Sequence, residues 1–502
     1  MLAEQLEDDA PVEGEWDVWR RRSGLALAPL AFLLAWWWCA ALAPSAQRLA
    51  AILAAVVVLW VSEGIPMAIT SFLGVAAAVV LHVAPANEAF APFADPLIFL
   101  FIGTFMLAQS IFHHGLDRRF AFAILGLRGV GEHPGRVLAA YGLVTCVISM
   151  WISNTATVAM MFPIGLSLLA VMESHGERCA PAYGAALLLA TSFAASIGGL
   201  ATPVGTPPNL IGIGFIRREV GVDLSFFQWM ALGLPVVAIL FTWSIANLWR
   251  GGAVRQGSLA GIARLIAAER GAQGAWTTGQ RNTMIAFGLT VFLWVFPGVV
   301  ALVSGQDDPF YKQLVGTFPE GVVALLGAGL LFVLPTNFAR HEFTLPWREA
   351  VKIDWWIVFL YGGGLALGSL AFKTGLAEAA GRGLTNLLGV HSGFGLLAFS
   401  TLLAAVLSET TSNTASANMV VPVVIAFARS AGIDPVLPAV GATMGASLGF
   451  MLPVSTPCNA IVYGSGRVPL TAMMRYGIAL DVAGVIVVVG VLGVLGPFVL
   501  GR

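Results

Sequence analysis

The sequence of 502 residues has few charged side chains, and this shortage restricts what the protein can be. Charged residues make up 11% of the chain, 58% of the residues are hydrophobic, and the mean hydropathy is +0.85. Soluble globular domains have about a quarter of their residues charged. The composition therefore excludes a soluble protein and predicts a polytopic membrane protein.

The sequence also lacks the features of a catalytic or nucleic-acid-binding site, such as clustered cysteines and an excess of basic residues. The four cysteines have neither metal-ligand spacing nor a recognisable pairing, so we interpret them as small core residues. They are Cys39, Cys146, Cys179 and Cys458. A net charge of −1 disfavours a nucleic-acid partner. No histidine lies near the polar clusters described below, where an enzyme would need a nucleophile with a base, or a metal cluster. We therefore expect a protein that is not an enzyme.

Apolar runs follow one another from Leu25 to Leu500 with short polar breaks between them. A spanning helix needs about 20 apolar residues, so we expect an all-α fold with about 11 transmembrane helices and two re-entrant helical hairpins. The first 17 residues are polar and acidic and lack the apolar stretch of a signal peptide. Arg20-Arg21-Arg22 precede the first apolar run and predict a cytoplasmic N-terminus and, by the number of crossings, an external C-terminus. Because no organelle or secretory signal is evident, we expect a bacterial inner membrane.

The breaks predict four regions and two matching sets of elements. The regions are a cytoplasmic tail (1–24), a first half (25–249), a cytoplasmic arginine-rich linker (250–282) and a second half (283–502). Each half is expected to hold a re-entrant hairpin, at about 137–171 and 394–428, and then a helix that proline and glycine break inside the membrane, at about 183–215 and 438–463.

Two polar clusters interrupt these apolar runs, from Ser149 to Thr157 and from Ser408 to Ser416, and each contains Ser-Asn-Thr. Unpaired polar groups in hydrocarbon cost several kcal/mol, so the clusters predict an enclosed polar pocket. Asn154 and Asn413 lie 259 positions apart, and the Thr-Pro steps at 206 and 456 lie 250 apart. An odd number of crossings separates the two sets. The pattern is typical of inverted repeats with binding near the midplane.

The polar clusters and broken helices contain no lysine or arginine; these segments are 137–163, 191–209, 400–422 and 439–459. An anion there must be held by amide and hydroxyl groups, by the N-termini of half-helices and by co-bound cations. Hydroxyl, amide and main-chain oxygens suit Na⁺. Ser and Thr also join helices in membranes as hydrogen-bond partners, but their recurrence at matching positions favours a binding site. Glu409, the one acid in the hairpin tips, is either functional or a structural tether.

On these residues the chain resembles the divalent anion:sodium symporter family. The matching motifs are Ser-Met-Trp-Ile-Ser-Asn-Thr-Ala-Thr at 149–157, Ser-Ile-Gly-Gly at 196–199, Val-Gly-Thr-Pro-Pro-Asn at 204–209 and Ser-Asn-Thr-Ala at 412–415. The order of apolar runs matches over nearly the whole chain after the first two dozen residues. The resemblance implies sodium-coupled symport of small C4 dicarboxylates, such as succinate, malate or fumarate, by a homodimer in the bilayer with an elevator mechanism.

The resemblance also implies roles for individual residues. Substrate would be bound by Asn154, Thr155, Thr206, Pro207, Ser412, Asn413, Thr414, Thr456 and Pro457. At least two sodium sites are expected: one from Ser149, Ser153, Asn154 and the carbonyl of Gly205, and one from Ser408, Thr411, Asn413 and Ser455. Since the two asparagines would contact both ion and substrate, each ligand would raise the affinity for the other.

One departure and several alternatives remain. Cys458 stands where the first repeat has Pro208, which leaves the backbone of the second sodium site less well defined. Within transport, the chain could instead be a sodium-independent anion exchanger or a carrier of citrate or sulfate. A Na⁺/H⁺ antiporter-like relative or an oxyanion permease of similar fold would need a titrating acid, for which Glu409 is the candidate in the tips.

Overall fold

The computed structural model describes residues 15–174, 181–252, 260–388 and 392–501. Helices dominate this part of the chain. The helices of the first half are α2 (Glu15–Trp38), α3 (Pro44–Ser62), α4 (Met67–Val80), α5 (Ala86–Phe90), α6 (Pro96–His113), α7 (Leu116–Leu125), α8 (Pro134–Ser149), α9 (Asn154–Ser174), α10 (Pro181–Gly199), α11 (Pro207–Phe215) and α12 (Phe226–Gly252), with short helical turns at Ala91–Ala94, Val130–Glu132 and Ile216–Val220.

The second half repeats this order after α13 (Ala260–Ala272). Its helices are α14 (Thr278–Ser304), α15 (Pro309–Thr317), α16 (Glu320–Val333), α17 (Trp347–Ala350), α18 (Trp355–Lys373), α19 (Leu376–Leu388), α20 (Gly393–Thr410), α21 (Asn413–Ser430), α22 (Val436–Gly445), α23 (Pro457–Gly464) and α24 (Leu470–Leu500). In the described residues, strands are limited to the antiparallel pair β1 (Pro335–Asn337) and β2 (Glu342–Phe343), which a helical turn at Phe338–Arg340 joins.

Nine helices of the described chain are long and apolar enough to span a membrane, or ten if the bent pair α15 and α16 forms one span. These nine include α9 and α20, which lie in the segments predicted to be hairpins. The count is below the predicted 11 because several apolar helices are short. Helix α4 has 14 residues and α22 has 10, whereas a full span needs about 20.

Two predicted region boundaries differ from the helix bounds. Helix α2 begins at Glu15, so residues 15–24 are helical although the sequence assigns them to the tail. Residues 1–14 lie outside the described chain. In the linker, α12 continues to Gly252 and α14 begins at Thr278, where Thr277 and Gln280 form a reciprocal capping box.

Each predicted hairpin segment contains two helices joined by a short polar turn. Helix α8 ends at Ser149 and α9 begins at Asn154, and the second pair breaks between Thr410 and Asn413. Polar side chains cap the new helices. The hydroxyl of Ser412 accepts a hydrogen bond from the Ala415 N–H at 3.2 Å, which satisfies a free donor at the start of α21.

The helix after each hairpin is broken where the sequence has glycine and proline. Helix α10 ends at Gly199 and α11 begins at Pro207, while α22 ends at Gly445 and α23 begins at Pro457. Proline suits the first position of a helix because it lacks the N–H that would be unpaired there. The breaks therefore expose main-chain groups beside new helix N-termini.

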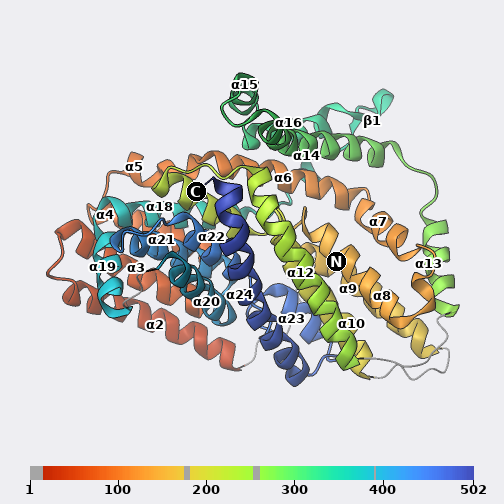
Figure 1. Cartoon of the computed structure of the whole chain (residues 1–502), viewed down its shortest axis with the longest axis horizontal. Coiled ribbons are helices and arrows are strands. Elements are labelled where there is room, and N and C mark those ends of the chain that lie inside the picture. The colour runs from red at the N-terminus through yellow and green to blue at the C-terminus, as the bar shows by residue number, and fades with distance from the viewer. Residues whose placement is uncertain (1–14, 175–180, 253–259, 389–391, 502) are drawn as a thin grey trace.

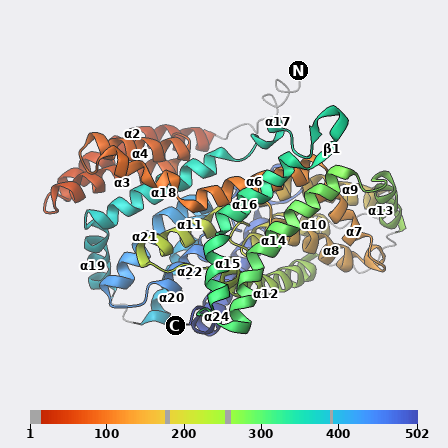
Figure 2. The same cartoon turned by 90° about the horizontal axis from the view of Figure 1, so that it is seen from above.

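The two hairpins lie on opposite sides of the neighbouring helices α12 and α24 (Figure 1). Helix α8 packs on α10, and α20 packs in the same way on α22. Helices α4 and α18 pack together, as do α6 and α16, and α2, α3 and α4 form a group at one side (Figure 2). Almost all of α10 is buried. The broken helix of the first repeat is thus in the core of the molecule.

Candidate functional site

The first hairpin places a serine and an asparagine in direct contact across its turn. The Ser149 hydroxyl donates a hydrogen bond of 2.8 Å to the side-chain oxygen of Asn154. Ser149 is fully buried and Asn154 is half-buried. Ser153, in the turn, accepts a long hydrogen bond of 3.4 Å from the Ala156 N–H. The turn thus presents oxygens at the N-terminus of α9.

The first helix break lies against this turn at two glycines. A Cβ atom on Gly199 would lie 2.5 Å from the Asn154 side-chain oxygen, and one on Gly205 would lie 2.5 Å from the Gly199 carbonyl oxygen. The side-chain amide of Asn209 donates to the carbonyls of Gly199 and Thr202, both at 2.8 Å. Glycine is needed here because the backbone approaches the asparagine so closely. Ser149, Asn154 and Gly205 are therefore brought together.

The second repeat builds the same arrangement. The Ser408 hydroxyl donates to the Asn413 side-chain oxygen at 2.7 Å. A Cβ on Gly449 would lie 3.1 Å from the Ser408 hydroxyl oxygen and 3.3 Å from the side-chain amide oxygen of Asn413. The Asn459 amide donates to the carbonyls of Gly449 at 3.1 Å and Leu452 at 2.9 Å. The contacts of one break thus recur 250 positions later.

The second set of predicted sodium ligands is assembled only in part. Ser455 joins Ser408 and Asn413, because its Cβ would be 3.3 Å from a Cβ on Gly449 and its hydroxyl donates to the Gly449 carbonyl at 3.1 Å. The hydroxyl of Thr411 instead donates to the Leu407 carbonyl at 2.8 Å. Thr411 is therefore the predicted ligand whose hydroxyl is directed into its own helix.

The predicted substrate residues lie at four helix N-termini. Asn154 and Asn413 begin α9 and α21, and Pro207 and Pro457 begin α11 and α23. Thr206 and Thr456 precede the prolines and are buried; the Thr456 hydroxyl accepts from the Asn459 N–H at 3.1 Å. Helix N-termini carry about half a positive charge and bind anions through free N–H groups.

Contacts between the repeats bring these N-termini toward one another. Helix α23 packs on α9 and α10, and the Cys458 thiol lies near the side chains of Thr155 and Thr456, so the first hairpin tip meets the second break. The Ser192 hydroxyl donates to the Asn459 side-chain oxygen. Helix α11, which follows the first break, packs on α21 of the second hairpin, so each hairpin contacts the break of the other repeat.

The remaining predicted substrate residues differ in their surroundings. Thr155 is exposed and Thr414 is buried. Pro207 is half-buried, whereas Pro457 is exposed. The Ser412 hydroxyl donates to the sulfur of Met67 in α4 at 3.3 Å. The contacts of Ser412 in the described chain thus point to capping and to α4 rather than to the paired breaks.

Sequence reasoning missed three parts of this site. Gly449 matches Gly199 at the same 250-position spacing as the Thr-Pro steps at 206 and 456, which is a usable signal. Asp481 lies inside the long apolar helix α24, and its side chain accepts from the Phe450 N–H at 3.3 Å; an acid within a membrane run is itself a signal. Cys458 is buried as predicted, but its thiol touches site residues rather than apolar core alone.

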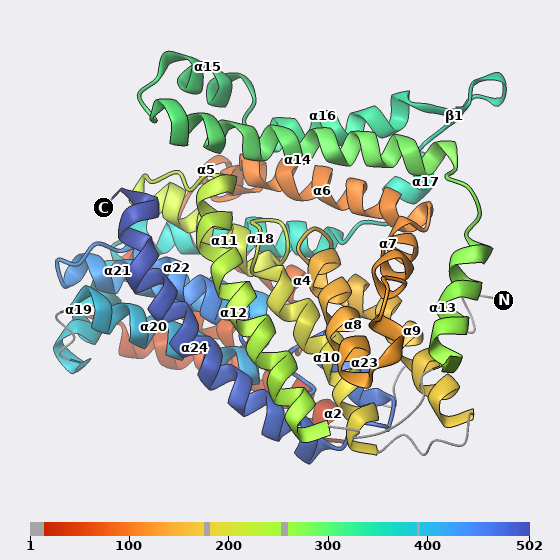
Figure 3. The same ribbon diagram turned by 45° about the vertical axis from the view of Figure 1, so that its right-hand side comes forward.

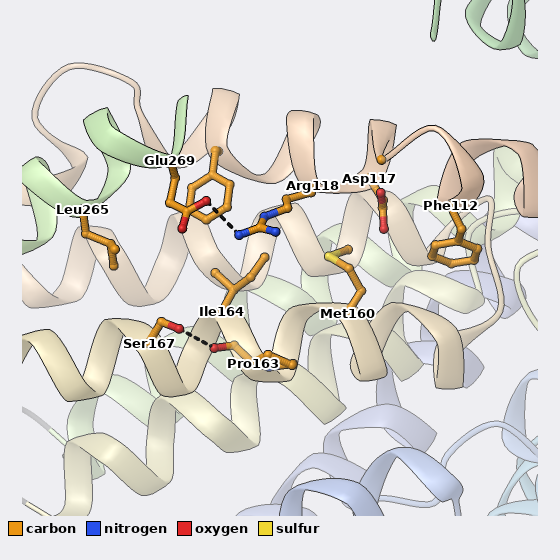
Figure 4. A pocket seen from close by; sticks show the side chains of 11 residues that line it. Phe112, Asp117, Arg118, Met160, Pro163, Ile164, Ser167, Leu265 and Glu269 are labelled. Carbon is orange, nitrogen blue, oxygen red and sulfur yellow. Dashed lines mark hydrogen bonds and ion pairs between the residues drawn. The ribbon is translucent and has the colours of Figure 1, made fainter. Parts of the chain in front are cut away.

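A separate cavity of about 360 Å³ lies between α6, α7, α9 and α13 (Figure 4). Its α9 wall begins at Met160, beyond the hairpin tip, and the ion pair between Arg118 and Glu269, 2.8 Å apart, crosses its other side. This cavity is mainly apolar and does not include the paired asparagines.

The donor set at the paired breaks suits a small hard cation and a carboxylate. Within the described residues, no cluster of three or more His, Cys, Asp or Glu side chains could hold a metal ion. The available ligands are hydroxyl, amide and main-chain oxygens, which fit Na⁺ and not a transition metal.

The chain matches known proteins over nearly its full length. A family model described as the sodium:sulfate symporter transmembrane region matches residues 21–500. The chain is similar to the sodium-dependent dicarboxylate transporter SdcS of Staphylococcus saprophyticus, with 33% identity over 449 residues, 88% of this chain and 84% of the relative. It is also 31% identical over 455 residues to SdcS of Staphylococcus aureus strain USA300, with the same coverage of each chain.

The fold is similar to that of a solved transporter. The structure of the YdaH transporter from Alcanivorax borkumensis aligns with 82% of this chain and 87% of its own, with a TM-score of 0.51 and 16% identity. At that identity the likeness concerns the arrangement of helices alone.

Proposed function

The chain belongs to the divalent anion:sodium symporter family, and from this membership we propose that it couples sodium ions to the uptake of small C4 dicarboxylates. It is an integral membrane transporter and not an enzyme. The observation that carries the proposal is the Ser–Asn hydrogen bond beside a helix break, present once in each repeat. A site duplicated in this way offers one half to each carboxylate of a short dianion.

The substrate is held without basic side chains. One carboxylate binds at Asn154 and Thr155 and the other at Asn413 and Thr414, with the Thr-Pro steps at 206 and 456 between them. The free N–H groups and partial positive charges of the half-helices stabilise the dianion. The remaining negative charge is balanced by the sodium ions that travel with it, so ion and substrate bind cooperatively.

Two sodium ions bind at the hairpin tips as cargo. Ser149, Ser153, Asn154 and the Gly205 carbonyl hold one ion, and Ser408, Asn413 and Ser455 hold the second, with Thr411 joining after its hydroxyl turns from Leu407. All of these ligands are oxygens, as sodium prefers. The contacts between Ser149, Asn154, Gly199 and Gly205 support the first site.

The arrangement of helices supports an elevator movement in a homodimer. The hairpins pack on the broken helices α10 and α22, while α4 packs on α18 and α6 on α16. These two groupings support a division of the fold into two bodies. We propose that the body with both hairpins moves and that the other forms the dimer contact. Helices α7, α13 and α17 gather near one end of α14, and α15 and the C-terminus lie near the other (Figure 3). This polarity is compatible with the proposed topology, in which the N-terminus is cytoplasmic and the C-terminus external.

The test is uptake of radiolabelled succinate into proteoliposomes with an inward sodium gradient. We expect uptake that falls to background when choline replaces Na⁺ and in both Asn154→Ala and Asn413→Ala. Ser167→Ala in α9, whose exposed hydroxyl only donates to the Pro163 carbonyl, serves as the matched control and retains uptake.

Other outcomes would redirect the proposal. Uptake that is independent of sodium but stimulated by internal dicarboxylate would make the protein an exchanger. Inhibition of succinate uptake by citrate or sulfate, with direct transport of either, would change the substrate class.

A further inference from the structure

A buried glutamate accepts hydrogen bonds from the main chain of the second helix break. Glu409 precedes the hairpin turn in α20, directly after Ser408, and only 7% of its surface is exposed. One carboxylate oxygen accepts from the Met451 N–H at 2.8 Å and the other accepts from the Leu452 N–H at 3.0 Å. The two oxygens therefore fix two successive peptide groups of the break.

A second carboxyl group extends this contact. Asp481 of α24 accepts from the Phe450 N–H at 3.3 Å, and its carboxyl group lies next to that of Glu409. Three consecutive N–H groups of the break, those of residues 450 to 452, thus donate to two carboxyl groups.

The opposite side of the same break is held through its carbonyls. Asn459 and Ser455 donate to the carbonyls of Gly449 and Leu452. The orientation of residues 449–455, and with it that of Ser455, is therefore determined from both sides. Removing either set of contacts would let the peptide planes rotate.

The first repeat has no equivalent acid in the described residues. The position that matches Glu409, 259 residues earlier, is Met150, whose main-chain carbonyl accepts a hydrogen bond from Thr202. The first break is tied to its hairpin by a neutral hydroxyl, and the second by a charged carboxylate. The two half-sites are alike in their serine and asparagine but differ in charge.

We propose that Glu409 is a positioning residue for the second sodium ion, which it serves by fixing the second break and by placing a negative charge next to Ser408. This inference rests on the sodium coupling proposed above. Neutral oxygens leave the charge of a bound cation uncompensated in a low-dielectric interior, where a carboxylate one residue from a ligand attracts it strongly. The second site then binds sodium more tightly than the first, which has no such charge.

The test is the sodium dependence of succinate uptake by Glu409→Gln. Glutamine keeps the size of the side chain and one acceptor for the Met451 N–H, but it removes the charge. We expect the half-saturating sodium concentration to rise at least tenfold, while KM for succinate at saturating sodium changes less than threefold. A purely structural tether would lower the maximal rate without this separation of sodium affinity from succinate affinity.

Two further variants bracket the effect. Asp481→Asn keeps an acceptor for the Phe450 N–H and a donor toward Glu409, so its shift in sodium affinity is smaller than that of Glu409→Gln. Glu173→Gln, at an exposed acid near the end of α9 that pairs with Arg467, retains the wild-type sodium curve. An unchanged sodium curve for Glu409→Gln would overturn the proposal.

A second measurement keeps the proposal testable if Glu409→Gln does not fold. In the wild-type protein, sodium is expected to slow amide hydrogen exchange of a peptide covering 446–456, compared with choline at equal ionic strength. No sodium-dependent protection there, in protein whose uptake requires sodium, would overturn the role of the break. Wild-type uptake without sodium dependence would instead refute the proposed function itself.

Discussion

The hydroxyl of Ser192 in α10 donates a hydrogen bond to the side-chain oxygen of Asn459 in α23, which joins the two repeats at their helix breaks. Both residues are fully buried. The amide group of Asn459 already holds the carbonyls of its own break, so Ser192 satisfies the one oxygen that remains. At the matching position, Asn209 has a buried side-chain oxygen with no hydrogen-bond partner in the described chain, and Ala442 stands where the counterpart of Ser192 would be.

This asymmetry predicts opposite effects of two substitutions. Ser192→Ala leaves the Asn459 oxygen buried and unpaired, so we expect a loss of about 1–3 kcal/mol of stability. Ala442→Ser offers Asn209 a donor and is expected to be neutral or stabilising by about 1 kcal/mol. Unfolding of the detergent-solubilised protein, followed by denaturant or heat, measures both. Ser167→Ala, an exposed serine, is the control, and an equal loss in it and in Ser192→Ala would contradict the prediction.

The close approach of Gly199 to Asn154 predicts that a methyl group there abolishes transport. A Cβ atom 2.5 Å from the Asn154 oxygen must displace the side chain that Ser149 holds. We expect Gly199→Ala to lower succinate uptake at least tenfold while the protein still folds. Gly184→Ala in the same helix meets no atom closer than 3.8 Å and is expected to keep uptake. Uptake retained in Gly199→Ala would show that Asn154 need not occupy this position.

The spacing of glycine, proline and asparagine was enough to predict where the helices break. Proline at 207 and 457 removes an N–H and so favours a helix start, and this rule is local. The matched Thr-Pro steps at 206 and 456, with the asparagines at 154 and 413, then indicate a repeat. Local rules also predict the turn between Ser149 and Asn154, because a polar cluster cannot stay unpaired in an apolar run.

The parts that sequence reasoning missed depend on contacts between distant segments. Asp481 reaches Phe450 from another helix, and the direction of the Thr411 hydroxyl depends on which main-chain carbonyl is free nearby. The number of helices long enough to span the bilayer differs from the predicted number of spans for a related reason. Helix α22 is only 10 residues long because its break comes early. Its apolar side chains, which hydropathy alone would place against lipid, pack against α20 instead.

The buried acid of α7 predicts a pH-dependent effect on stability. Asp117 is 6% exposed in the wall of the separate cavity, and burial raises the pKa of its carboxyl group (Figure 4). The unfolded state therefore ionises at lower pH than the folded state, and ionisation disfavours folding above the folded pKa. Asp117→Asn removes this penalty.

We expect Asp117→Asn to raise Tm at pH 7.5 and to have a smaller effect near pH 4, where much of the group is still protonated in the unfolded state and more of it in the folded state. Scanning fluorimetry over this range measures the difference. Asp307→Asn, at an exposed residue paired only with Lys312, is the control and should change Tm little at either pH. A stabilisation that stays constant with pH would show that Asp117 acts through packing rather than through its charge.

The pair of Arg217 and Asp95 predicts a measurable coupling between α11 and α6. Arg217 follows α11, on the side where the positive-inside rule expects few basic residues, and it lies 2.5 Å from the Asp95 carboxylate. Asp95 is 9% exposed, caps α6 by accepting from the Leu97 N–H at 2.9 Å, and also accepts from the Tyr361 hydroxyl. Asp95 thus neutralises, within the protein, an arginine that departs from the positive-inside rule.

Asp95→Asn keeps the cap of α6 but removes the carboxylate that forms the ion pair with the partly buried Arg217 guanidinium, so we expect a loss of about 1–3 kcal/mol of stability. Arg217→Gln should lower the stability of the Asp95→Asn protein by less than it lowers that of the wild type. In the Asp95→Asn protein, the arginine has already lost its ion-pair partner. A double-mutant cycle measured by unfolding should give a coupling energy of about 0.5–3 kcal/mol. Additive losses would mean that solvent, rather than Asp95, compensates the arginine, and that α11 and α6 are held together by apolar packing alone.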